Sequence, residues 1–140
     1  MALKQLSVYA ENKKGTLVKA TTAIAAAGID MKSICVADTE QFGIFRILTS
    51  DQEGAKKALE NVGLTASARM IVGVALPNVP GGLNHVLQVL SDAEINIEYM
   101  YSILSPRTDT ACMAIRVDDN EAAERLLTEK GYQVLSDADF

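Results

Sequence analysis

The sequence repeats itself at a spacing of 66 residues. The stretch Val8–Leu17 returns as Val74–Leu83, and each copy carries a glycine near its end, Gly15 or Gly81. Further along, the spacing grows to 68 residues, because two extra residues fall near Pro106, where we expect a loop. A repeat of this length is too long for a solenoid unit and long enough for a small domain. The sequence therefore predicts two copies of one domain, at residues 1–69 and 70–140.

Composition supports a folded protein. The chain has 140 residues, of which 49% are hydrophobic and 22% are charged, as in globular domains with a real core. Each copy alone has a modest core, since small domains bury a smaller share of their surface. We therefore expect the copies to pack on each other or on a second chain.

Charge and hydropathy exclude two classes of partner. The net charge is −5, and the basic residues cluster only at Lys13-Lys14 and Lys56-Lys57, so we expect no nucleic-acid partner. No apolar run approaches the length that spans a bilayer, and the N-terminus lacks the apolar region of a signal peptide. We expect no membrane contact and a cytoplasmic location.

Periodicity changes at each glycine. Before the glycine, alternate apolar residues predict a strand: Leu6, Val8 and Ala10 in the first copy, and Val72, Val74 and Leu76 in the second. After the glycine, one apolar helix face is predicted: Leu17, Ala20, Ile24 and Ala25 in the first copy, and Leu83, Val86, Leu87 and Leu90 in the second.

The remaining elements also match between copies. Strands are predicted at Met31–Ala37, Gly43–Thr49 and Leu64–Ala68, and again at Ile97–Leu104, Ala111–Val117 and Tyr132–Leu135. Helices are predicted at Gln52–Asn61 and Asn120–Glu129. Each copy is thus β-α-β-β-α-β, which gives an α+β, ferredoxin-like fold with a four-stranded antiparallel sheet and both helices on one face. No linker separates the copies, and we expect a strand to run through Arg69-Met70 from one into the other.

The sequence offers no catalytic apparatus. His85 is the single histidine and has no nucleophile or acid placed beside it, so we expect no catalysis by it. The acidic residues fit no metal-binding loop, and no phosphate-binding glycine motif is present, so we expect no metal and no cofactor. Cys35 and Cys112 lie in predicted strands, and we interpret them as reduced core residues. We therefore expect a protein that is not an enzyme.

The glycine turn is the remaining candidate site. Gly15 and Gly81 lie between a predicted strand and a predicted helix, where glycine allows a tight turn and the close approach of a ligand. The N–H groups that open the helix favour an anion such as a carboxylate. These groups belong to Gly15, Thr16 and Leu17 in the first copy and to Gly81, Gly82 and Leu83 in the second. An ordinary strand-to-helix connection would explain the same glycines.

The second copy also resembles a known family. Asn78-Val79-Pro80-Gly81-Gly82-Leu83 followed by Ile95-Asn96-Ile97 resembles the ACT domain, a regulatory amino-acid-binding module, and in particular the serine-sensing domain of phosphoglycerate dehydrogenase. The resemblance implies that Asn78 and Asn96 contact a ligand. In the first copy, Asn12 and Asp30 occupy these positions. The resemblance covers the whole chain and implies a stand-alone tandem of ACT domains.

Two departures from the family pattern stand out. Leu76 replaces a histidine that precedes the first Asn in the family, and Asp30 replaces the second Asn in the first copy. Geometry adds a constraint, since the parallel strands of one β-α-β unit put Asn78 and Asn96 at opposite ends of a sheet. We expect sites where two domains pair, with Asn12 and Gly15 facing Asn96, and Asn78 and Gly81 facing Asp30. The pairing could lie within one chain or across a homodimer.

Three functions follow from this reading. The first is a non-catalytic sensor that binds an amino acid, or a related carboxylate, between domains and regulates a partner enzyme of amino-acid metabolism. The second is a regulatory subunit that acts mainly by protein contact, similar to the small subunit of acetolactate synthase. The third is a small enzyme of unknown class, for which the sequence names no catalytic residue.

Overall fold

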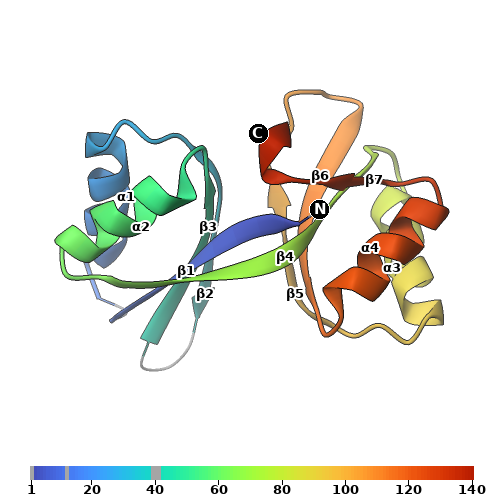
Figure 1. Cartoon of the computed structure of the whole chain (residues 1–140), viewed down its shortest axis with the longest axis horizontal. Coiled ribbons are helices and arrows are strands. Elements are labelled where there is room, and N and C mark those ends of the chain that lie inside the picture. Colours follow the sequence, from blue (N-terminus) through green and yellow to red (C-terminus); the bar gives the residue numbers. More distant parts are fainter. Residues whose placement is uncertain (1, 12, 39–41) are drawn as a thin grey trace. The chain divides into compact units, whose positions relative to one another are not determined.

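Both copies of the repeat form the same succession of elements in a computed structural model of the chain, which describes residues 2–11, 13–38 and 42–140 (Figure 1). The first copy contains β1 (Leu3–Glu11), α1 (Thr16–Ala26), β2 (Met31–Asp38), β3 (Phe42–Thr49), α2 (Gln52–Asn61) and β4 (Thr65–Pro77). The second continues from β4 with α3 (Gly82–Asp92), β5 (Ile97–Ile103), β6 (Thr110–Val117), α4 (Asn120–Glu129), β7 (Gln133–Leu135) and a 3-10 turn (Asp137–Asp139).

Strand β4 takes part in both copies. It runs unbroken for 13 residues and passes through Arg69 and Met70, as the sequence predicted. The chain divides inside this strand into two compact units. The first unit is Lys4–Arg69, and the second is Met70–Phe140 together with Ala2 and Leu3.

The two sheets have the same strand order. In the first unit the order is β2-β3-β1-β4, and in the second it is β5-β6-β4-β7. Strand β3 pairs antiparallel with both β1 and β2, and β6 pairs antiparallel with both β4 and β5. In each unit both helices lie on one face of the sheet (Figure 1). The ferredoxin-like β-α-β-β-α-β class is therefore confirmed for both copies.

A left-handed glycine sets the rotation of the first helix in each unit. Gly15 has φ 85° and Gly81 has φ 82°, a backbone that only glycine adopts at little cost. From this start, the buried positions follow every four residues, at Thr16, Ala20 and Ile24 in α1 and at Gly82, Val86 and Leu90 in α3. The two stripes have the same phase, offset by 66 residues like the repeat itself.

This phase corrects part of the predicted helix faces. Leu17 and Ala25 are exposed rather than buried, because the stripe begins one residue earlier, at Thr16. In α3, Val86 and Leu90 are buried as predicted, and Leu83 is partly buried against the core. Leu87 is half-buried and lines a surface hollow instead of packing into the core cluster that the described residues form.

The second helices were easier to predict. Both have the predicted bounds, Gln52–Asn61 and Asn120–Glu129. Each presents an alanine and a leucine to its core, Ala55 and Leu59 in α2 and Ala123 and Leu127 in α4. In the part of the chain that the structure describes, no helix combines the length and apolar character needed to cross a membrane.

Strand β1 is buried on both faces over residues 5–8, whereas Tyr9 and Glu11 nearer its end are exposed. Leu6, Val8 and Ala10 belong to the core of the first unit, as the alternation predicted. Gln5 and Ser7, which the same alternation would leave in solvent, are buried too. The Gln5 amide donates to the Ser7 hydroxyl at 3.2 Å, so these two polar side chains satisfy part of each other's hydrogen-bonding need.

The cysteines are both free thiols. Cys112 is buried in β6, as expected of a core residue, whereas Cys35 in β2 is only half-buried. The prediction of a core position holds for Cys112 alone.

The buried stripe predicts unequal costs for two leucines on α3. Leu90→Ala should lower the free energy of unfolding by about 2–5 kcal/mol, because it leaves a cavity in the core of the second unit. Leu87→Ala should lower the free energy of unfolding by less than half of that amount, since part of the Leu87 side chain is already in solvent. Urea unfolding of both variants measures the difference, and equal losses would show that the stripe is misplaced.

Candidate functional site

The four helices fall into two classes at their N-termini. Helices α2 and α4 are capped by Asp51 and Asp119, whose carboxylates accept from the N–H groups of Gly54 and Ala122 at 2.9 and 3.0 Å. Both also carry a glutamate in the first turn. Helices α1 and α3, which follow the glycine turns, have no side-chain cap and no acidic residue in the first turn. The first N–H group of each donates within the turn, from Thr16 to the Lys13 carbonyl at 3.3 Å and from Gly82 to the Val79 carbonyl at 3.0 Å. The helix N-termini therefore have no protein anion beside them.

The first glycine turn opens onto a cavity of about 620 Å³. Gly15 and Thr16 line it, together with three lysines, Lys13, Lys14 and Lys19. The opposite wall is the turn between α2 and β4, at Gly63, Leu64 and Thr65, and β1 contributes Tyr9, Ala10 and Glu11. Of the residues predicted for this site, Leu17 lies outside the cavity lining, and Asn12 lies outside the described residues.

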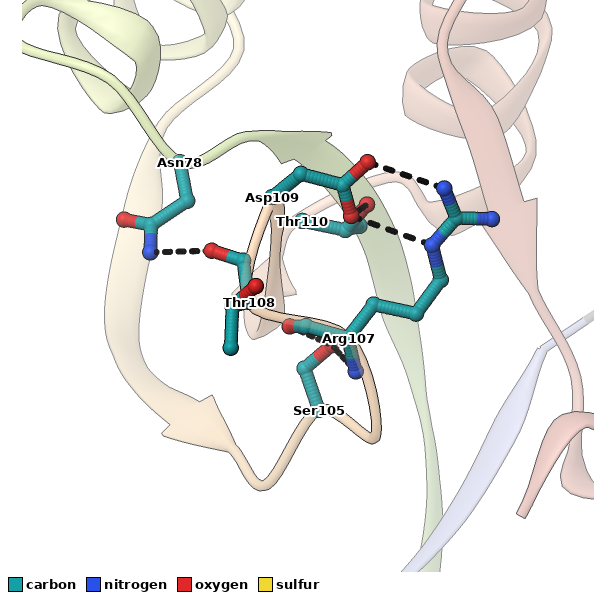
Figure 2. Close-up of polar contacts among 6 residues, drawn as sticks. All are labelled: Asn78, Ser105, Arg107, Thr108, Asp109 and Thr110. Atoms are coloured by element: carbon teal, nitrogen blue, oxygen red, sulfur yellow. Dashed lines mark hydrogen bonds and ion pairs between the residues drawn. The ribbon is translucent and has the colours of Figure 1, made fainter.

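The second glycine turn is tighter. Gly82 is buried, and a Cβ atom added there would collide with the carbonyl oxygen of Pro77. The turn is also tied to the loop between β5 and β6, because the Asn78 side-chain amide donates to the Thr108 carbonyl at 2.9 Å (Figure 2). The Asn78 backbone N–H donates to the Asp109 carbonyl at 2.9 Å. Asn78, predicted as a ligand contact, thus uses one of its two side-chain N–H donors within the fold.

An ion pair stiffens the loop that Asn78 holds. The Arg107 guanidinium donates twice to the Asp109 carboxylate, at 3.0 and 2.8 Å (Figure 2). These hydrogen bonds, with another from the Thr110 hydroxyl, keep the pKa of Asp109 below its ordinary value. The pair is fully exposed, so we expect it to order the loop more than to stabilise the fold.

The predicted second-strand residues lie far from the turns of their own units. In the first unit, the end of β1 pairs with Phe42, whereas the start of β2 pairs with Thr49. The seven residue steps from Phe42 to Thr49 along β3 span about 23 Å. The second unit repeats this register, with Pro77 opposite Thr110 and Ile97 opposite Val117. Asp30 and Asn96 would therefore reach a ligand at a glycine turn only from a different domain.

Asp30 and Asn96 have different surroundings. The Asp30 carboxylate pairs with Lys32 at 2.6 Å, and its backbone exchanges hydrogen bonds with Ser50. Asn96 is exposed and lines an open hollow of about 470 Å³, with Leu87, Ser91, Glu94, Ile95 and Ile97. Asp30 is thus committed to local contacts, whereas Asn96 faces an open surface.

Glu94 has an unusual backbone at this hollow. Its φ is 58°, and it is the one non-glycine residue with positive φ among those described. The matching residue in the first unit is Gly28, with φ 71°. In both units the turn makes the same hydrogen bonds, from Gly28 N–H to Ala25 and from Glu94 N–H to Ser91, each at 2.9 Å. Glu94 therefore takes a glycine's conformation at the end of α3.

Sequence analysis missed three contributors to these sites. Lys19 lies four residues after Gly15, one helical turn along α1, and this spacing was the available signal. The wall at Gly63–Thr65 is 48 or more residues from Gly15 in sequence, and no local pattern connects the two segments. Glu94 could have been found as the residue that replaces Gly28 in the repeat.

The described residues offer no metal centre. No group of three or more His, Cys, Asp or Glu side chains among them could hold a metal ion. His85 lies exposed on α3, and no hydrogen bond to its side chain occurs in the part of the chain that the structure describes.

The close approach at the second turn gives a test of its geometry. Gly82→Ala should lower the free energy of unfolding by about 1–3 kcal/mol, because the new methyl group must displace the Pro77 backbone. Asn84→Ala, an exposed change two residues later on the same helix, is the matched control and should stay within about 0.5 kcal/mol of the parent. Thermal and urea unfolding measure both, and a neutral Gly82→Ala would contradict the described turn.

The chain belongs to the family of ACT domain pairs, since the model of that family matches residues 1–140. No curated protein matches the sequence. Protein BT0572 from Bacteroides thetaiotaomicron is similar over nearly the whole length. The two are 37% identical, the match covers 99% of this chain and 95% of that one, and the TM-score is 0.91.

A more distant likeness concerns the fold alone. The regulatory subunit of aspartate kinase from Thermus thermophilus, in its ligand-free form, is 21% identical, with 90% of each chain covered and a TM-score of 0.63. The same subunit from Thermus flavus gives the same values. The chain therefore shares its fold with these subunits, that of a tandem pair of ACT domains.

Proposed function

We propose that this chain is a non-catalytic regulatory protein that binds an amino acid, or a related carboxylate, at its glycine turns. The observation that carries the proposal is the contrast between the helices. Aspartate caps α2 and α4, whereas no acidic side chain caps α1 or α3, so the positive ends of these two helices favour an outside anion. A ligand carboxylate would take the place that Asp51 and Asp119 occupy on the other two helices.

The proposed mechanism is a shift between domain arrangements. Asp30 and Asn96 can reach a glycine turn only from a different domain. A ligand that contacts a glycine turn of one domain and Asp30 or Asn96 of another would therefore favour the arrangement of domains that brings these groups together. A partner enzyme of amino-acid metabolism that binds this arrangement would then respond to the ligand. The family of ACT domain pairs and the fold shared with a regulatory subunit of aspartate kinase support a regulatory role.

Regulation mainly by protein contact is the second candidate. The edge strand β2 exposes Ile34 and Val36, at 43% and 53% of their surface, on the face that also carries the helices. Edge strands with exposed apolar side chains are templates for association. A subunit of this kind would bind its enzyme through β2 with or without a small ligand.

Two charge variants test the carboxylate proposal. Val18→Glu and Asn84→Glu each place a glutamate at the third residue of an uncapped helix, α1 or α3, at exposed positions. Each should stabilise the fold by about 0.3–1 kcal/mol, because an acid near a helix N-terminus is favourable. Each should also weaken binding at its own turn, since the new carboxylate competes with the ligand. A thermal-shift screen of the amino acids finds the ligand, and calorimetry measures the change.

Val18→Gln and Asn84→Gln are the matched controls, because they keep the size of the side chain without the charge. They should leave ligand affinity near that of the parent. If the glutamate and glutamine variants bind alike, the carboxylate does not lie at these helices. If no amino acid or carboxylate raises the melting temperature, regulation by protein contact becomes the better explanation.

A further inference from the structure

The cavity at the first glycine turn carries more positive charge than one carboxylate requires. Lys13 forms an ion pair with Glu11, at 3.1 Å. Lys14 and Lys19 line the same cavity, and neither has an ion-pair partner among the residues that the structure describes. Two lysine charges therefore border the cavity in addition to the partial positive charge of the α1 N-terminus.

An unpaired hydroxyl in the cavity wall points independently to a ligand. Thr16 is only 9% exposed and lines the cavity. Its backbone N–H donates to the Lys13 carbonyl at 3.3 Å, but its hydroxyl has no hydrogen-bond partner among the described residues. A hydroxyl can donate one hydrogen bond and accept others. A ligand atom in the cavity would supply such a partner.

The second unit shows that the fold itself does not require these groups. Its turn has the same left-handed glycine, Gly81, and its helix has the same phase. Yet Val79 and Pro80 stand where the first unit has Lys13 and Lys14. Gly82 replaces Thr16, and His85 replaces Lys19. The two units thus have the same turn but different side chains around it.

We infer that the cavity bounded by the α1 N-terminus and the Gly63–Thr65 turn binds a small dianion. One negatively charged group lies at the positive end of α1 and accepts from the Thr16 hydroxyl. The second charge lies beside the ammonium groups of Lys14 and Lys19. An acidic amino acid, a free dicarboxylate and a phosphate share this chemistry. The acidic amino acid and the dicarboxylate rest on the proposed function, whereas phosphate does not.

Calorimetry on the full chain tests the inference with five probes: L-aspartate, L-glutamate, succinate, inorganic phosphate and L-serine. At least one dianion should bind about tenfold or more tightly than L-serine, on the scale of one charge-assisted hydrogen bond. The affinity should fall as potassium chloride rises, because the lysines are exposed to solvent. The double variant Lys14→Ala/Lys19→Ala should abolish the preference. Lys57→Ala, an exposed lysine of the same unit outside the cavity lining, should not.

Thr16→Val separates a ligand contact from a structural role. The change keeps the shape and removes the hydroxyl, so the melting temperature should stay the same or rise, while the affinity for the dianion falls about tenfold. Thr16→Ser should restore binding, and Thr22→Val, an exposed change on the same helix, should alter neither quantity. A Thr16→Val variant that loses stability and keeps its affinity would overturn the assignment of Thr16.

The remaining outcomes distinguish the two proposals. Equal binding of L-serine and L-aspartate would overturn the dianion inference and leave the amino-acid proposal standing. Binding of phosphate alone would support the dianion inference and contradict the proposal of an amino acid or related carboxylate at this turn. A dianion whose affinity does not change in the lysine variants would bind elsewhere, and this would overturn the inference. Failure of every probe to bind would overturn the dianion inference, and the thermal-shift screen would then decide the amino-acid proposal.

Discussion

The left-handed backbone at Gly15 and Gly81 is the constraint on which each unit depends. It completes the turn from strand to helix, and it fixes which residues of the helix meet the sheet. The same turn leaves the first N–H groups of α1 and α3 without a side-chain cap, whereas aspartates cap the other two helices. One conformational requirement thus determines both the core packing and the place where an anion is favoured.

Much of this fold could be predicted from the sequence, because each hydrophobic pattern occurs in both copies of the repeat. The bounds of α2 and α4 follow from an aspartate cap at one end and a glycine at the other, and these signals are local. The faces of α1 and α3 were harder to predict. Leu17 and Leu87 are large and apolar, so they suggested core positions, but the glycine turn places Thr16 and Gly82 on the buried stripe instead. Side-chain type alone cannot reveal that shift in phase.

The candidate site could be predicted only in part, for a related reason. Gly15 and Gly81 could be predicted as site residues because they lie between a predicted strand and a predicted helix. The wall at Gly63–Thr65 comes from the far end of the unit, and the Asn78 amide is already bonded to Thr108. Tertiary contacts decide such features, and a motif shows which residue occupies a position without showing what that residue touches. The family resemblance therefore gave the positions of the asparagines but not their hydrogen bonds.

Glu94 has a consequence for how the second unit moves. Its backbone is left-handed without the freedom of a glycine, and its negative charge stands at the negative end of α3. Both effects lower the local stability of the last turn of α3 relative to that of α1, which ends before Gly28. Segments of low local stability open most often without global unfolding. In this chain, transient fraying would begin where α3 passes into β5, and it would loosen the segment that holds Asn96.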